Sequence, residues 1–149
     1  MPLAEYLATE QARDRLKTAD VLTMPSASEW HGHGQRVVIE QCKAWWRVSV
    51  TVADETVSAY YRPDGDRYIV TDLGEGWRAL RLRGIDWHTN DEIINKVDAV
   101  ALPLMSPEPG YETSAPWGTL ELRYVAAADL PDAICRVMLA SLRVAGVQP

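Results

Sequence analysis

The sequence predicts an α+β fold, in which an antiparallel β-meander has N-terminal and C-terminal helices packed on one face. Two patterns lead to this prediction. Apolar and polar residues alternate from Trp46 to Val52, which is typical of a half-buried strand. From Ile134 to Ala145 the apolar residues instead recur at helical spacing. Because the helices are expected on one face, the other face of the sheet should be at least partly open.

The composition is that of one globular domain covering residues 1–149. Of these residues, 47% are apolar and 24% are charged, which excludes a disordered or fibrous chain. No apolar run approaches the length of a membrane span, and the start from Met1 to Asp20 is unlike a signal or transit peptide. Cys42 and Cys135 are far apart and predict buried free thiols. We therefore expect a soluble protein of the bacterial cytoplasm.

The N-terminal part is predicted to form a helix, then a loop, then a segment that two structures fit. Helix-forming residues fill 3–19, and Met24–Ser28 ends this helix. We expect Trp30–Gly34 to be a loop because glycines interrupt it. Residues 37–46 fit a helix face and a strand equally well, so their structure stays open at this point.

Three strands are expected next, over residues 46–52, 56–62 and 67–71. Asp54 and Glu55 form the first turn. Pro63–Asp66 forms the second turn, because Pro63 fixes its φ and Gly65 accepts a positive φ. Turns this short can join only antiparallel strands, which gives the meander.

The rest of the chain is predicted to contain three helices, one loop and one strand. A short helix carries Trp77 and ends at Gly84, and a second helix begins with a capping box at Thr89–Glu92. Residues 103–117 contain too many prolines for regular structure and should form a long surface loop. A strand over 120–124 and a helix opened by Asp129 and Pro131 follow, and Gly146 ends that helix.

Four carboxylates near the third strand are candidates for catalysis or metal binding: Asp64, Asp66, Asp72 and Glu75. Carboxylates can act as an acid–base pair or hold a divalent cation, but only if they converge in space. The simpler interpretation is that Asp64 and Asp66 form the turn and that Asp72 caps the next helix. Two alternatives therefore remain for these carboxylates: an acid–base pair or cation site, or a purely structural role in turns and a helix cap.

Two histidines lie close together in the Trp30–Gly34 segment. His31 and His33 lack a third ligand, and the position of His88 does not supply one. The sequence has no HExxH motif, no GxSxG motif, no phosphate loop and no dinucleotide motif. We therefore assign no catalytic residue, no metal ligand and no cofactor.

Negative charge is concentrated in the middle of the chain. The net charge is −6, and residues 84–132 hold far more carboxylates than the two cations Lys96 and Arg123. This balance argues against direct binding of nucleic acid. It fits either a solvated surface or a surface that meets a basic partner.

Tyrosines and tryptophans accompany these carboxylates. Tyr111 and Trp117 lie in the predicted proline-rich loop, where burial in a core is harder to arrange. Tyr60 and Tyr61 are neighbours in a strand, so one of them should be exposed on the open face. The expected partner-binding residues are Asp91, Glu92, Asp98, Glu108, Tyr111, Glu112 and Trp117.

Residues 55–80, ETVSAYYRPDGDRYIVTDLGEGWRAL, resemble DUF1828, an uncharacterised domain family of bacteria and phages. The matching residues are Asp64, Gly65, Tyr68, Val70, Thr71, Asp72 and Gly74. In the family pattern, an N-terminal helix and a strand precede this motif and a helix follows it. The resemblance implies that order of elements and a mobile-element context, and it implies no activity.

These observations give two hypotheses on function. The first is a small acidic interaction protein of phage or prophage type. It would be a non-enzymatic inhibitor, of the anti-CRISPR or another anti-defence kind, that binds a basic surface of a host nucleic-acid-handling complex; this inference is an analogy. The alternative is a small metal-dependent enzyme, such as a nuclease, that uses Asp64, Asp66, Asp72 or Glu75.

Overall fold

The computed structural model describes residues 2–18, 27–85, 90–105, 112–114 and 118–148. Its strands are β1 (Ala27–Gly32), β2 (Gln35–Cys42), β3 (Trp45–Val52), β4 (Glu55–Asp64), β5 (Arg67–Thr71), β6 (Glu112–Ser114) and β7 (Glu121–Val125). Its helices are α1 (Leu3–Leu7), α2 (Glu10–Thr18), α3 (Glu75–Leu82), α4 (Asp91–Met105) and α5 (Leu130–Ala145), with a short 3₁₀ turn at Ala127–Asp129.

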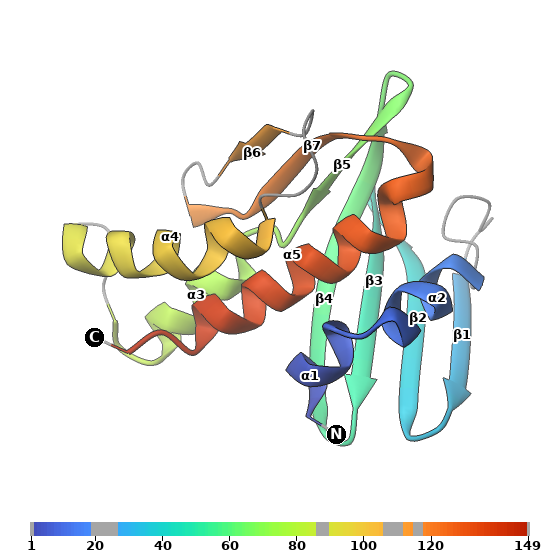
Figure 1. Ribbon diagram of the computed structural model, residues 1–149, viewed down its shortest axis with the longest axis horizontal. Helices are drawn as coiled ribbons and strands as arrows, with labels where there is room; N and C mark the ends of the chain where they lie inside the picture. Colours follow the sequence, from blue (N-terminus) through green and yellow to red (C-terminus); the bar gives the residue numbers. More distant parts are fainter. Residues whose placement is uncertain (1, 19–26, 86–89, 106–111, 115–117, 149) are drawn as a thin grey trace.

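The strands form one antiparallel sheet of seven strands in the order β1-β2-β3-β4-β5-β7-β6. Helix α5 crosses one face of this sheet, with α1 and α2 on one side of it and α3 and α4 on the other (Figure 1). The predicted α+β class, with an antiparallel meander and terminal helices on one face, is therefore confirmed.

The alternation of side chains along the strands separates the two faces of the sheet. The helix-covered face holds the following buried residues: Val37, Ile39, Val48, Val50, Val57, Ala59, Tyr61, Val70 and Leu122. On the opposite face the polar side chains pair across strands; Ser49 and Ser58 lie 2.7 Å apart, and Thr51 and Thr56 lie 2.8 Å apart. The core thus lies between the sheet and α5, and the opposite face is largely open.

The N-terminal third differs from the prediction in three places. The helix expected over 3–19 is two helices, because the chain turns at Ala8 between α1 and α2. The loop expected at Trp30–Gly34 is wrong, since residues 27–32 form β1 and only His33 and Gly34 turn, both with positive φ. Residues 37–46, which the sequence left open, form β2 and the start of β3.

The long loop expected over residues 103–117 is also wrong for the part that the structure describes. Pro103 lies in the last turn of α4, where its missing N–H leaves the carbonyl of Ala99 without a helical donor. Residues 112–114 form β6, which pairs with β7. Residues 106–111 and 115–117 lie outside the described residues.

Helix α5 is the central element of the fold. Pro131 stands in its first turn, where a backbone N–H has no helical acceptor anyway. Its buried residues are Leu130, Ala133, Ile134, Cys135, Val137, Met138, Leu139, Ala140, Ser141 and Val144. The helical spacing of apolar residues over 134–145 also predicts that Leu142 and Ala145 lie on the buried side, but both are only half-buried. The helix contacts all four other helices as well as β4, β5 and β7, so it is covered on several sides.

Candidate interaction surface

Helix α4 has one buried side and one exposed side. Ile93, Val97, Ala101 and Met105 are buried at helical spacing. Asp91, Asn95, Asp98 and Leu102 follow one another along a neighbouring side of the helix; Asp98 is half-buried and the other three are exposed. We call these four residues, with Glu92 beside them, the α4 stripe; it spans about 16 Å of helix.

The α4 stripe carries negative charge with one local cation. Glu92 is 77% exposed and lies 3.6 Å from Lys96, one helical turn further on. Such an exposed pair contributes little to stability, so Glu92 remains available to another cation. Asp91 forms no ion pair with the described residues, and Leu102, at 40% exposure, adds an apolar end to the stripe. Carboxylates flanking an exposed apolar side chain suit a basic protein surface.

Three of the seven expected partner-binding residues thus share one surface, namely Asp91, Glu92 and Asp98. Glu108, Tyr111 and Trp117 lie outside the described residues. Glu112 begins β6, and its side chain also lies outside the description. Thr89 of the expected capping box lies outside the described residues; at the start of α4 the Asn90 Oδ1 accepts from the backbone N–H groups of Glu92 and Ile93.

The four carboxylates considered for catalysis do not converge. Asp64 and Asp66 are exposed at the β4–β5 turn, whereas Asp72 follows the other end of β5. A five-residue strand separates these two positions by about 16 Å. Among the described ranges, no group of three His, Cys, Asp or Glu side chains could hold a metal ion. The geometry therefore gives the metal-dependent alternative no support.

Asp72 is fully buried and serves as a structural hub. Its Oδ1 accepts from the N–H groups of Gly74 at 2.8 Å and Leu120 at 3.0 Å. Its Oδ2 accepts from the Gly76 N–H at 3.0 Å and the Ser141 hydroxyl at 3.2 Å. The expected capping role is confirmed and extended, since one carboxylate joins the start of α3 to β7 and α5.

Glu75 is held at the open face of the sheet by Tyr60. The Tyr60 hydroxyl donates to Glu75 Oε1 at 2.7 Å. Burial, and then this bond, raises the pKa of Tyr60 above its usual value. The expectation that one of Tyr60 and Tyr61 is exposed is wrong, because they are only 6% and 2% exposed. Tyr61 enters the core, while the hydroxyl of Tyr60 reaches Glu75 in the first turn of α3.

Charged side chains on the open face pair with each other. Arg47 donates to Glu40 on the neighbouring strand, and Glu29 accepts from Arg36 at 2.7 Å and contacts His31 at 2.6 Å. The bond from Arg36, followed by that from His31, lowers the pKa of Glu29. These pairs neutralise each other locally, so the open face has less excess charge than the α4 stripe.

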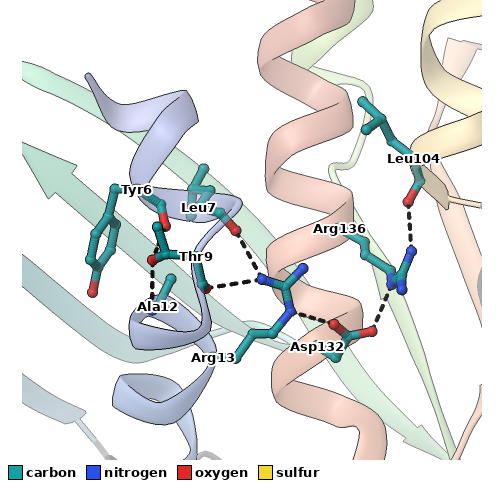
Figure 2. A network of polar contacts seen from close by, with 8 residues as sticks. All are labelled: Tyr6, Leu7, Thr9, Ala12, Arg13, Leu104, Asp132 and Arg136. Carbon is teal, nitrogen blue, oxygen red and sulfur yellow. Dashed lines mark hydrogen bonds and ion pairs between the residues drawn. The ribbon is translucent and has the colours of Figure 1, made fainter. Parts of the chain in front are cut away.

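A polar network that the sequence did not predict joins three helices (Figure 2). Arg13 of α2 donates through Nε to Asp132 Oδ1 at 2.5 Å, and Arg136 donates to Oδ2 at 2.6 Å. The Arg13 guanidinium also reaches the carbonyls of Leu7 and Thr9, at the break between α1 and α2. Arg136 bonds the Leu104 carbonyl near the end of α4. The network therefore fixes the helices to each other rather than forming a reactive site.

The pKa of Asp132 reflects two opposing effects. Burial raises it, whereas the bonds from Arg13 and Arg136 lower it, and the net result is a pKa below the usual value. The spacing of Asp132 and Arg136, four residues apart on α5, was a sequence signal for half of this network. The Arg13 contact had no such signal, because it joins residues from opposite ends of the chain.

No family model, curated protein or solved structure matches the chain. The resemblance to DUF1828 therefore stays a prediction. No helix in the described parts of the chain is long and apolar enough to cross a membrane. The function must accordingly be argued from the geometry of the surfaces themselves.

Proposed function

We propose that the protein is a non-enzymatic interaction protein whose α4 stripe binds a basic surface of a macromolecular partner. The observation that carries this proposal is the stripe itself. Asp91, Asp98 and Leu102 lie along one side of a helix that is anchored in the core by its neighbouring side; Asp91 and Leu102 are exposed and Asp98 is half-buried. A rigid helix that presents carboxylates in a fixed row suits electrostatic docking, because little side-chain and backbone freedom is lost on binding.

The charge distribution of the whole chain supports the same proposal. The excess of carboxylates lies in residues 84–132, which contain α4, whereas basic and acidic residues nearly balance before residue 84. The open face of the sheet follows this balance, since Arg36 and Arg47 are each paired with a glutamate. A basic partner is therefore attracted to the side of α4 in preference to the open face.

The partner that we propose is a basic channel or groove of a nucleic-acid-handling complex of the host. Such surfaces are built to neutralise phosphates, and a row of carboxylates competes for the same cations. An inhibitor of phage or prophage type, including the anti-CRISPR kind, is the particular form that the sequence suggests. This form predicts that captured complexes lose nucleic-acid binding when the protein is added.

Capture from a bacterial host lysate, followed by binding kinetics with the captured complex, tests the proposal. The triple variant Asp91→Lys, Glu92→Lys, Asp98→Lys should slow association strongly, and added salt should weaken wild-type binding because charges are screened beyond about 8 Å at physiological ionic strength. The matched control reverses three exposed turn carboxylates instead, namely Asp54, Asp64 and Asp66. It should bind like the wild type.

The expected aromatic contacts should affect a different rate constant from the charges. Replacing Tyr111 and Trp117 by Ala should speed dissociation more than it slows association, because aromatic anchors act after docking. An affinity that changes neither with salt concentration nor in either set of variants contradicts the proposal. The proposal is also contradicted if wild type and triple variant capture the complex equally well and the captured complex still binds nucleic acid.

A further inference from the structure

Strand β1 forms one edge of the described sheet and pairs only with β2 in it. The two strands are joined by His33 and Gly34, both with positive φ, and Gly32 lies opposite Gln35. The two residues that flank a turn of this kind, here Gly32 and Gln35, exchange backbone hydrogen bonds with each other. Along an antiparallel ladder such pairs alternate with pairs that exchange none. The backbone groups of Trp30 therefore face β2, whereas those of Glu29 and His31 face outward.

The side chains of β1 point alternately to the open face and to the helix-covered face of the sheet. Glu29 and His31 lie on the open face and are well exposed, at 45% and 65%. Trp30 lies on the helix-covered face and is half-buried. The edge therefore presents an acidic and a basic group two residues apart, with an aromatic ring between them on the other side.

We propose that β1 pairs antiparallel with β1 of a second copy of this chain, about a two-fold axis at Trp30. In this register the outward backbone groups of Glu29 meet those of His31 in the second copy, and the converse pair completes the symmetry. Each carboxylate then lies opposite an imidazole. A register centred on Glu29 would instead set two carboxylates opposite each other, and one centred on His31 would set two imidazoles opposite each other.

The contacts of Glu29 leave room for this pairing. Its bonds from Arg36 and with His31 both use Oε1. Within the described residues, Oε2 can therefore accept from Nδ1 of His31 of the second copy, whose Nε2 keeps the bond with its own Glu29. Carboxylates can accept several hydrogen bonds, so the new bond does not require the loss of the Arg36 bond.

The aromatic contact at the axis fits the same register. Trp30 lies opposite Trp30 of the second copy. The two residues exchange no backbone hydrogen bonds, and in such pairs the side chains come closest. A hollow of about 440 Å³, lined by Tyr6, Arg15 and Trp30 among others, lies on this side of the sheet. The Arg15 guanidinium carbon is 3.5 Å from the centre of the Trp30 ring, and the ring lies over Gly32, where a Cβ would be 2.7 Å from Cζ2. In the proposed dimer the second indole lies beside this cation–π pair at the two-fold axis.

A pair of six-residue strands gives a small interface, so the dimer should be weak and reversible. Sedimentation of the full chain over a range of concentrations should show a monomer–dimer equilibrium. His31→Glu should raise the dimer Kd about tenfold, because it sets two pairs of like charges opposite each other. Glu29→Lys should also weaken the dimer, because it removes the carboxylate that accepts from His31 of the second copy. Thr56→Glu, a similar charge change on the open face away from the edge, is the matched control and should leave Kd unchanged.

Mixing the two weakened variants tests the register. In the mixed dimer, the carboxylate introduced at position 31 of one variant meets the ammonium introduced at position 29 of the other. The second pair keeps its original Glu29 and His31, so dimer formation should return. Circular dichroism of each variant checks that the fold is intact. A chain that stays monomeric at every concentration overturns the proposal, as does a dimer indifferent to His31→Glu or a mixture that fails to associate.

Discussion

Asp72 and Leu120 are joined by a hydrogen bond of 3.0 Å between a buried carboxylate oxygen and a backbone N–H, although 48 positions separate them. The same carboxylate bonds two N–H groups at the start of α3 and the Ser141 hydroxyl of α5. A single carboxylate group therefore sets the position of three elements relative to each other. Its loss should affect the whole fold rather than one turn.

Asp72→Ala should lower the free energy of unfolding by about 3 kcal/mol or more, because it leaves several buried donors without an acceptor. Asp72→Asn should also destabilise, since its amide N–H₂ faces donors that met an oxygen. Urea unfolding followed by tryptophan fluorescence measures both changes. Asp64→Ala, at an exposed turn, serves as the control and should change stability little. An Asp72→Ala protein as stable as that control would contradict the hub role.

Asp132 should make stability depend on pH. Its pKa in the folded protein lies below the unfolded value, which is about 3.9. The group therefore stabilises the fold fully above the unfolded pKa, and this contribution is lost as the pH falls through the folded pKa. Because the side chain is 35% exposed, we expect only about 1 kcal/mol.

Unfolding measured between neutral and acidic pH compares wild type with Asp132→Asn. The wild type should lose more stability than the variant as the pH falls, and the two curves should converge at low pH. Glu92→Gln, whose carboxylate forms a largely exposed pair with Lys96, is the control. Parallel curves for wild type and Asp132→Asn would show that the Arg13 and Arg136 contacts do not stabilise the ionised form.

Gly65 occupies the turn between β4 and β5 with a φ of +66°. No heavy atom of the described structure lies within 4 Å of a Cβ built there, so a side chain would meet no obstacle. Gly65→Val should still cost about 1–2 kcal/mol, because a β-branched residue strongly disfavours positive φ. Asp66→Val at the neighbouring exposed position controls for the change in polarity. An unchanged melting midpoint for Gly65→Val would contradict the turn conformation.

Met138 is fully buried in the middle of α5. Met138→Ala should lower the free energy of unfolding by about 2–5 kcal/mol, through lost apolar contact and the cavity left behind. The exposed Arg143 on the same helix provides a control, because Arg143→Ala changes helix composition without opening the core. A loss for Met138→Ala no larger than for the control would contradict the buried position.

The two cysteines should differ sharply in reactivity. Burial raises the pKa of Cys135 to about 12, so it carries almost no thiolate at neutral pH. Cys42, at the end of β2, is only half-buried, so the expectation that both thiols are buried is wrong for this residue. Brief alkylation of the folded protein, read by peptide mass spectrometry, should label Cys42 and leave Cys135 unmodified until urea is added. Equal labelling of both under native conditions would contradict the burial of α5.

The meander could be predicted because the residue patterns that specify its strands and turns each lie within a few neighbouring residues. Strict alternation over Trp46–Val52 and a Pro-Asp-Gly turn define strands and connections within a few residues. β2 was less clear, because Val37, Val38 and Ile39 are consecutive apolar residues on both faces of a strand. Val38 lies on the open face and is half-buried there, so the sequence shows no clean period.

The acidic side of α4 could also be predicted, since charge and helical spacing are both visible in the chain. The network around Asp132 could not, because Arg13 meets it only after α2 packs beside α5. The same holds for Asp72, where a cap was predicted but the contacts with Leu120 and Ser141 depend on the assembled core. Long-range partners of buried charges were thus the part that the sequence could not supply.

The position of α5 has a consequence for the order of events during synthesis. This helix supplies much of the surface that covers the apolar side of the sheet, and it follows every strand in the chain. If the strands pair as they leave the ribosome, we expect much of their apolar side to stay exposed to water until residues 130–145 emerge. We therefore expect the nascent chain to expose apolar surface during this interval, when chaperone binding competes with self-association. Docking of α5 then completes the core.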